Sequence, residues 1–335
     1  MTMRVCVLGG GSWGTALGLH SARVGHRTTI WEYDPSLAAA HQAARENSRY
    51  LPGISFPDPL NMTGDLEEAL SEAEIVLAVV PSQTMRSTIE RAAAFLPEKA
   101  TLCIASKGVE QKSLMTMDEV LCDVLDPVHH SRIAVLSGPS FALELAQEKA
   151  TAVVVASKSE NLAEETAEAF HAGNFRVYHS TDVVGVEMGG AIKNVMAIAC
   201  GICDGAGLGT NCRAALITRG LAEITRLAVA RGANPLTLAG LAGMGDLVLT
   251  CTGDLSRNRR VGLGLGQGKT LSTILEELGQ VAEGVMTARS AYNLGIQTQV
   301  EMPITREVYA MLYEDKPVPV ALSDLLGRQR KAELD

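Results

Sequence analysis

Aromatic side chains are scarce in this chain of 335 residues, where Phe, Trp and Tyr together make up 4%. The core therefore has to be built mainly from Ala, Val, Leu and Ile. Hydrophobic residues still account for 47% of the chain and charged residues for 20%, which excludes an intrinsically disordered protein. The length is sufficient for two domains.

Basic residues are also fewer than acidic residues. The chain has 29 Lys and Arg against 38 Asp and Glu, for a formal net charge of -9. The one basic run that stands out is Ser256–Arg260. The sequence therefore argues against a nucleic-acid partner.

Long uncharged apolar stretches are missing as well. The best candidate, Val183–Cys203, contains Glu187, Lys193 and Asn194. The apolar run that follows Arg4 is four residues long, too short for a signal peptide. We therefore expect no membrane span and a cytoplasmic protein.

The seven cysteines are an odd number in a chain without an export signal, which fits free thiols in a reducing compartment. Cys200 and Cys203 form a C-x-x-C pattern, but no second pair lies at metal-ligand spacing. We interpret both as small buried residues of a helix, and we expect no metal site.

The start of the chain has the pattern of a dinucleotide-binding turn. An apolar run, Val5–Leu8, is followed by Gly9, Gly11 and Gly14 in the spacing G-x-G-x-x-G, and then by a helical pattern. The first glycine permits the tight turn, the second lets a pyrophosphate approach the backbone, and the third lets the helix pack against the strand. The free N–H groups of that helix then face the phosphates. A second run ends in Glu32, near the expected position of the acid that binds the adenosine ribose.

Strands and helices alternate through the first half of the chain. This alternation predicts an α/β fold, a Rossmann-type doubly wound parallel sheet with helices on both faces. Two further strands, Thr151–Ala156 and Arg176–His179, extend the sheet, so that the dinucleotide-binding domain spans residues 1–180. The other expected strands are Arg4–Leu8, Thr28–Glu32, Glu74–Val80, Thr101–Ala105 and Ile133–Ser137, and the expected helices are Ser12–Val24, Leu37–Arg45, Gln83–Ala94 and Leu114–Leu125, with a short helix capped by Asp65.

Polar residues follow several of these strands, at the sheet edge where such folds bind ligands. Lys107 follows the fourth strand and would point into the cofactor crevice, with a solvated loop lysine as the alternative. Gly138 and Ser140 belong to a Gly-Pro-Ser turn that offers N–H groups at a helix start. After the third strand, Ser82 is expected to cap the next helix.

The second half, residues 181–335, is expected to be an all-α substrate domain. Its first helix carries Lys193 in an apolar stretch, where a lysine is costly unless it is paired or its pKa falls. Asp246 is a carboxylate beside glycines. Ser256–Arg260 is either a solvated basic turn or, as we favour in an acidic protein, an oxyanion receptor. Together with a dinucleotide crevice, these residues predict hydride transfer to a ketone, in which a cation or proton donor meets the developing alkoxide.

The chain resembles the bacterial NAD(P)-dependent glycerol-3-phosphate dehydrogenases over nearly its whole length. The resemblance implies interconversion of dihydroxyacetone phosphate and sn-glycerol 3-phosphate, the backbone precursor of phospholipids, by a homodimer. The motifs that carry it are Gly9–Gly14, Ser106–Gly108, Ser137–Ala142, Gly189–Val195, Gly245–Leu247, Thr250–Thr252, Ser256–Arg260, Met302–Thr305 and Leu325–Arg328.

The resemblance also implies roles for individual residues. Lys193 would be the general acid/base, with Lys107 and Asp246 as the other catalytic groups. The substrate contacts would be Lys107, Gly138, Ser140, Lys193, Asn194, Asp246, Ser256, Arg257 and Asn258. The cofactor contacts would be Gly9, Gly11, Ser12, Trp13, Gly14, Glu32, Tyr33, Lys107, Ala142, Arg257, Val281 and Glu283.

The end of the second strand departs from many relatives of this family, which have a small residue or a nearby Arg there and accept NADPH. Here Glu32 and Asp34 would repel a 2′-phosphate. The sequence therefore favours NAD(H) over NADP(H), with Arg45 or Arg49 folding back onto the phosphate as the opposing possibility.

Two other functions remain open at this point. A related 2- or 3-hydroxyacid dehydrogenase shares the arrangement of a Rossmann domain followed by helices with Lys and Asn, but Ser256–Arg260 suits a phosphate better than a lone carboxylate. A non-catalytic NAD(H)-sensing protein would need no proton donor at Lys193.

Overall fold

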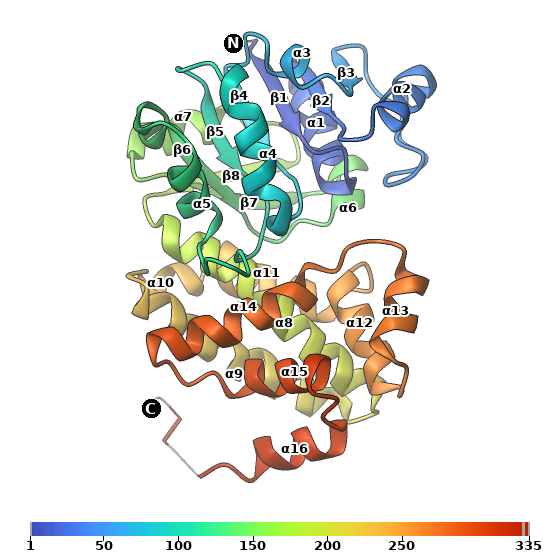
Figure 1. Cartoon of the computed structure of the whole chain (residues 1–335), viewed down its shortest axis with the longest axis vertical. Coiled ribbons are helices and arrows are strands. Elements are labelled where there is room, and N and C mark those ends of the chain that lie inside the picture. The colour runs from blue at the N-terminus through green and yellow to red at the C-terminus, as the bar shows by residue number, and fades with distance from the viewer. Residues whose placement is uncertain (1, 330–331, 334–335) are drawn as a thin grey trace.

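The sheet forms one half of the molecule and a group of helices forms the other half (Figure 1). The structure is a computed structural model that describes residues 2–329 and 332–333. Its eight strands lie in the order β3-β2-β1-β4-β5-β6-β7-β8. Their bounds are β1 Arg4–Leu8, β2 Arg27–Trp31, β3 Leu60–Thr63, β4 Ile75–Ala78, β5 Thr101–Ile104, β6 Ile133–Ser137, β7 Thr151–Ala156 and β8 Phe175–Ser180.

The expectation of a wholly parallel sheet is wrong at its far side. Strands β1 to β6 pair in parallel, but β7 pairs with β6 antiparallel, and β8 is parallel to β7. Between β6 and β7 the chain makes only the five-residue helix α6, Ala142–Ala146. A helix of five residues is only about 7.5 Å long. It does not carry the chain back along the sheet, as a parallel neighbour of β6 would require, and β7 pairs antiparallel to β6 instead.

Helices cover both faces of the sheet, as the alternation predicts. On one face Leu17 and Leu19 of α1 pack with Phe170 of α7 in a common core. On the other face Met85 and Ile89 of α4 pack with the helix α5. The bounds are α1 Ser12–Val24, α2 Pro35–Ala44, α3 Leu66–Leu70, α4 Met85–Ala92, α5 Met117–Val124 and α7 Glu160–Phe170.

A long buried helix, α8, runs through the centre of the helical half (Figure 1). The other helices surround it and bury its side chains, including Lys193 and Asn194. The bounds are α8 Val183–Gly205, α9 Gly209–Ala230, α10 Pro235–Leu238, α11 Asp246–Thr252, α12 Arg257–Gly266, α13 Leu271–Leu278, α14 Glu283–Thr298, α15 Pro303–Tyr313 and α16 Val318–Leu326, with a π-helical turn at Leu241–Gly245.

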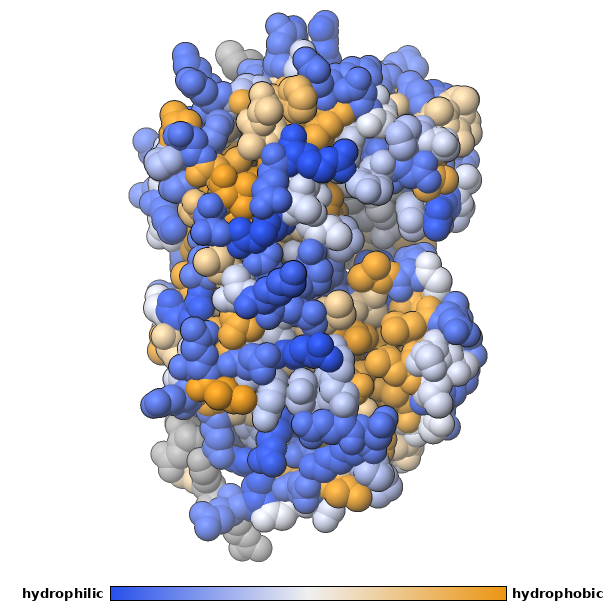
Figure 2. All heavy atoms as spheres, in the orientation of Figure 1, coloured by the Kyte–Doolittle hydropathy of each residue, from blue (hydrophilic) through white to orange (hydrophobic). Residues whose placement is uncertain are grey.

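Two stretches are long and apolar enough to cross a membrane by length and composition alone. In α8 the apolar window is 94% buried within the protein, and in Pro235–Thr252 it is 39% buried. Most of the face shown in Figure 2 is polar, and hydrophobic side chains gather beside the narrowing between the two halves, over α12 and α13.

Helices α8 and α12 pack with their backbones in direct contact. A methyl group placed on Gly201 would lie 2.9 Å from the Cα of Gly262, and the reverse distance is also 2.9 Å. One turn further on, Gly205 and Gly266 meet in the same way. Both helices therefore have glycines four residues apart at their crossing, which lets α12 approach the helix that carries Lys193.

Gly201→Ala is expected to lower the free energy of unfolding by about 3 kcal/mol, because backbone on both sides leaves the methyl group no room. Urea unfolding of the two proteins measures the difference. A glycine in an uncrowded helix interior gives the opposite sign, with alanine stabilising by up to about 1 kcal/mol. Stabilisation by Gly201→Ala would therefore contradict the close contact.

Candidate active site

The glycine-rich turn has the geometry that a dinucleotide requires. Gly9 has a φ of +119°, a backbone conformation that residues with side chains rarely adopt. A methyl group on Gly14 would collide with the carbonyl oxygen of Gly9. By contrast, apart from atoms of Gly11 itself, its chain neighbours and its own helix, no described atom lies within 4 Å of a methyl group on Gly11. Gly11 is also the N-cap of α1, and no described side chain caps this helix. Its first N–H groups therefore face open space where a pyrophosphate fits.

Trp13 supports this fit. Its indole Nε1 is buried and has no hydrogen-bond partner among the described residues. Buried donors are normally paired, so this N–H is available to a bound group beside the turn.

Glu32 lies against the same turn. Its carboxylate would collide with a methyl group on Gly10, and it accepts a hydrogen bond of 3.2 Å from the N–H of Asp34. Arg45 does not reach it, because Arg45 donates to the carbonyl of Pro57 at 2.7 Å. Arg49 stacks on the ring of Tyr50, with its Cζ 5.2 Å from the ring centroid. Both arginines are thus engaged elsewhere.

The central feature of the site is a carboxylate that bridges two lysines. One oxygen of Asp246 pairs with the Nζ of Lys193, and the other pairs with the Nζ of Lys107 at 2.7 Å. Lys107 also donates to the carbonyl of Gly138 at 3.0 Å. Asp246 is 1% exposed and Lys193 is 7% exposed, so these charges are compensated inside the protein.

Burial lowers the pKa of the Lys193 ammonium from its ordinary value to about 8. Asp246 opposes this shift and the charge of Lys107 adds to it. An amine with a pKa near neutrality can both give and take a proton, as general acid–base catalysis requires.

Thr250 also contacts Lys193, although in the sequence it is only one residue of the motif Thr250–Thr252. Its hydroxyl oxygen accepts from the Nζ of Lys193 at 2.8 Å and donates to the carbonyl of Asp246 at 2.7 Å. Its position four residues after Asp246 on α11 places both on one helix face, a signal visible in the sequence. The π-helical turn Leu241–Gly245 precedes Asp246 directly, and such turns are frequent at functional sites.

Asn258 is held by its neighbours rather than projecting freely toward a ligand. Its amide nitrogen donates to the side-chain oxygen of Asn194 at 2.9 Å, and its oxygen accepts from the N–H of Gly284 at 2.8 Å. It thereby joins α12, α8 and α14. The amide nitrogen of Asn258 carries a second hydrogen, and within residues 2–329 and 332–333 no acceptor is recorded for it, so it can donate to an oxyanion.

The N-terminus of α12 presents the anion-binding groups. Ser256 is the N-cap and accepts from the N–H of Arg259. Arg257 is half-buried, and its Nη1 lies 3.5 Å from the Oε1 of Gln280. Burial lowers the pKa of the Arg257 guanidinium while Glu283 opposes the shift. A charged guanidinium in this setting gains from an anionic ligand.

Arg259 does not belong to this receptor. Its guanidinium pairs with Asp204, at 2.7 Å from Nη2, and with Asp254, at 2.9 Å from Nη1. Only part of the basic run expected to receive an oxyanion is therefore free to do so.

Ser82 does not cap the helix that follows it, so that expectation is wrong. Its N–H and its hydroxyl both donate to the carboxylate of Glu283, at 3.0 and 2.6 Å. Glu283 begins α14 in the helical half, so this contact joins the two halves beside Gly108. Burial raises the pKa of Glu283, with the bonds from Ser82 acting against the shift.

The structure brings most of the expected residues into one connected site. Lys193 and Lys107 both pair with Asp246, and Gly108, the residue after Lys107, lies beside the carboxylate of Glu283. Gly284, the residue after Glu283, donates a hydrogen bond to Asn258. Asn258 in turn donates to Asn194, the residue after Lys193. Ser140 donates to the carbonyl of Gly138 at 2.9 Å, and Ala142 begins α6. Ser12 lies at the start of α1, while Tyr33 and Val281 are exposed.

His, Cys, Asp and Glu side chains do not cluster as metal ligands in the part of the chain that the structure describes. No group of three or more His, Cys, Asp or Glu there is arranged to hold a metal ion. Cys200 and Cys203 are buried free thiols of α8.

A nucleotide-binding turn at a Rossmann-type sheet, joined to a helical half with a buried lysine of low pKa, defines a nicotinamide-dependent dehydrogenase. Two family models match this chain: that of the amino-terminal part of NAD-dependent glycerol-3-phosphate dehydrogenase over residues 4–163, and that of the carboxy-terminal part over residues 182–323. The chain belongs to this family.

Relatives and a solved structure agree with this assignment. The glycerol-3-phosphate dehydrogenase [NAD(P)+] of Geobacter metallireducens is 54% identical, over 99% of both chains. The corresponding enzyme of Myxococcus xanthus is 50% identical, also over 99% of both chains. The crystal structure of glycerol-3-phosphate dehydrogenase from Coxiella burnetii is 40% identical, with a TM-score of 0.93, and covers 98% of this chain and 99% of its own.

Proposed function

We propose that this protein reduces dihydroxyacetone phosphate to sn-glycerol 3-phosphate, and that Lys193, Lys107 and Asp246 form its catalytic centre. The observation that carries the proposal is the pairing of both lysines with one buried carboxylate. Family membership supports the reaction, and the full-length matches favour it over a hydroxyacid dehydrogenase or a cofactor sensor.

When bound, the nicotinamide supplies a hydride to the ketone carbon. The Lys193 ammonium gives its proton to the ketone oxygen, which becomes the new hydroxyl group. Lys107 contributes positive charge beside the developing alkoxide. Asp246 holds both nitrogens in place and keeps Lys193 protonated near neutral pH, and Thr250 fixes the direction of the Lys193 ammonium.

The proposed phosphate site is the N-terminus of α12, with the Arg257 guanidinium, the N–H groups that follow Ser256, and the free amide hydrogen of Asn258. Helix N-termini bind phosphates through their N–H groups and dipole. Ser140 and Gly138 would lie beside Lys107 at the other end of the substrate, and this phosphate contact would position the carbonyl.

Comparison of dihydroxyacetone phosphate with unphosphorylated dihydroxyacetone tests this assignment. We expect NADH oxidation with the first substrate and a loss of at least two orders of magnitude in kcat/KM with the second, because a charged receptor is left unpaired. Equal turnover of the two ketones would show that the chain does not recognise a phosphate.

Arg257→Ala is expected to lower kcat/KM for dihydroxyacetone phosphate by about a hundredfold, since a charge-assisted contact held into the transition state is lost. Steady-state kinetics measure this change. Arg260→Ala is the matched control, because Arg260 is exposed on the same helix, and its kinetics should stay near those of the unmodified protein. A similar loss in both variants would indicate only a general effect of positive charge.

We also propose a preference for NAD(H) over NADP(H). Support comes from the carboxylate of Glu32 beside the turn and from Arg45 and Arg49 being engaged elsewhere. Glu32→Ser is expected to raise kcat/KM for NADPH about tenfold and to lower that for NADH, because repulsion of the 2′-phosphate and the ribose contact are both removed. Equal or better turnover of NADPH by the unmodified protein would contradict the preference.

Several wider properties complete the proposal. The chain would divide into a dinucleotide-binding domain, residues 1–180, and a helical substrate domain, residues 181–335. The protein would act as a cytoplasmic homodimer that supplies phospholipid synthesis, without a membrane span. The burial of α8 and the charged cluster around Asp246 in Pro235–Thr252 support the last point.

A further inference from the structure

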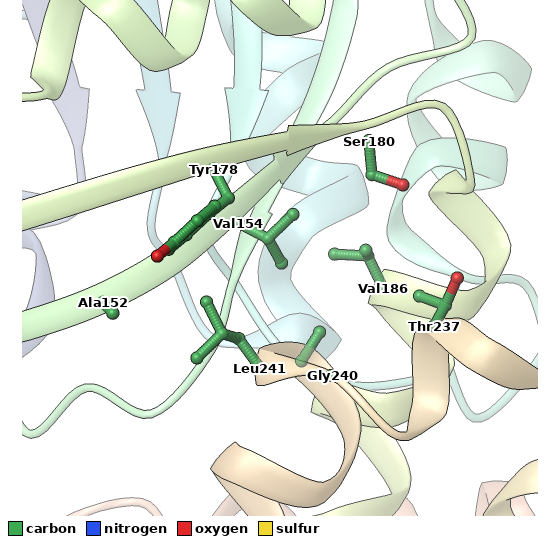
Figure 3. Close-up of a pocket in the computed structure, with 9 residues that line it drawn as sticks. Ala152, Val154, Tyr178, Ser180, Val186, Thr237, Gly240 and Leu241 are labelled. Atoms are coloured by element: carbon green, nitrogen blue, oxygen red, sulfur yellow. The ribbon is translucent and has the colours of Figure 1, made fainter.

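A pocket of about 390 Å³ opens between the edge of the sheet and the helical half (Figure 3). None of its lining residues is among the catalytic, substrate or cofactor contacts assigned above. Ala152 and Val154 of β7 and Tyr178 of β8 form one side. Val186 of α8 and Leu241 of the π-helical turn lie across from them. Its volume and its mainly apolar lining are those of a small-molecule site.

Two walls of this pocket belong to the elements that carry the catalytic pair. Val186 is seven residues before Lys193, two turns along the same face of α8. Ala242 belongs to the π-helical turn that leads into Asp246. The two walls touch each other, because a methyl group on Gly189 would lie 2.5 Å from the carbonyl oxygen of Ala242. A group that wedges these walls apart would move Lys193 relative to Asp246.

The third wall, strand β7, is connected through β6 to the residue that binds Lys107. Val154 pairs with Ser137 across the antiparallel strands β7 and β6. The next residue, Gly138, is the one whose carbonyl accepts the hydrogen bond from Lys107. All three walls of the pocket are therefore continuous with groups that hold the two lysines.

The lining indicates the chemistry of the ligand. Among the residues that the structure describes, no charged side chain lines the pocket, and the hydroxyl groups of Ser180 and Thr237 lie on one side of it (Figure 3). Arg176 lies next to the pocket. It pairs in register with Ala152, and its Cζ lies 5.0 Å from the ring centroid of Tyr178. The interior thus suits an apolar body, and the exposed guanidinium suits an acidic head group.

We propose that this pocket is a regulatory site for a small apolar carboxylic acid, whose binding disturbs the Lys193–Asp246 pair and slows turnover. The expected slowing of turnover rests on the proposed function, whereas binding of the acid to the pocket is measured without substrate. A failure of either can therefore be recognised separately: absence of turnover contradicts the function, and absence of binding contradicts the pocket.

The probe is 2-naphthoate, with uncharged 2-naphthol as its matched control. Isothermal titration of the full chain should show saturable binding of 2-naphthoate at one site, tighter than that of 2-naphthol, and Arg176→Gln should remove the difference. In assays, 2-naphthoate should lower kcat about fivefold without competing with NADH or with dihydroxyacetone phosphate.

Ala152→Leu fills the pocket from β7, and Ala239→Leu adds the same atoms to an exposed position near its rim. The first variant should turn over substrate but neither bind 2-naphthoate nor respond to it, and the second should behave as the unmodified protein. Undiminished binding by Ala152→Leu, competition with NADH, equal binding of 2-naphthol, or binding without a change in kcat would each overturn the proposal.

Discussion

Lys193→Ala lowers kcat for dihydroxyacetone phosphate by about a thousandfold if this lysine is the proton donor, in line with the usual contribution of general acid catalysis. NADH binding should survive, because the glycine-rich turn and Glu32 lie on other elements. Fluorescence titration of NADH, together with steady-state turnover, separates the two effects. Near-normal turnover in this variant would contradict the assignment.

The pH dependence gives the same assignment a second readout. Reduction needs the protonated ammonium, and the pKa of Lys193 is lowered to about 8. The value of kcat/KM for dihydroxyacetone phosphate should therefore be highest below this pH and fall as pH rises through it. In Lys193→Ala, the residual rate should lose this step. A step that persists in the variant would belong to another group.

Asp246→Asn is expected to have the second large effect, because it leaves two lysines without their shared counter-charge. Removing one partner of a buried ion pair costs about 3 kcal/mol, which urea unfolding measures. The step in the pH–rate profile should also move to lower pH, since Asp246 is the main group that raises the pKa of Lys193 against burial.

The sign of the stability effect follows from linkage. The folded-state pKa of Lys193 lies below its ordinary value, so the folded protein binds fewer protons than the unfolded chain between the two values, and stability rises with pH there. In Asp246→Asn the pH range over which stability rises begins at a lower pH, because the folded-state pKa of Lys193 is lower. Asp254→Asn is the control, because Asp254 pairs with Arg259 while its own side chain is 95% exposed, and it should shift neither stability nor the pH profile by much. Equal effects in both variants would contradict the role of Asp246.

Local chemistry was enough to predict much of the fold. The helix Ser12–Val24 and the strand Arg4–Leu8 have the predicted bounds, and Asp65 caps α3 as expected. Strand β3, Leu60–Thr63, was missed because it is four residues long, alternates buried and exposed positions, and lies at the sheet edge. The reversal at β7 depends on which strand it pairs with, and the short helix α6 between β6 and β7 is the one local sign of it.

In the candidate site, too, single residues could be predicted from the sequence, but their contacts with one another could not. Lys107, Lys193 and Asp246 could be singled out because charge in apolar or strand-end positions is unusual. Their joint pairing does not follow from the local sequence, because Asp246 is 139 residues from Lys107 and 53 from Lys193. The contact of Ser82 with Glu283 spans 201 residues and was missed for the same reason.

Substrate-dependent oxidation of NADH by the purified chain tests the central claim most directly. The reaction should require dihydroxyacetone phosphate, yield sn-glycerol 3-phosphate in equal amount to the NADH consumed, proceed more slowly with NADPH, and nearly vanish in Lys193→Ala. Absence of oxidation with either cofactor, or oxidation that does not depend on dihydroxyacetone phosphate, would contradict the account.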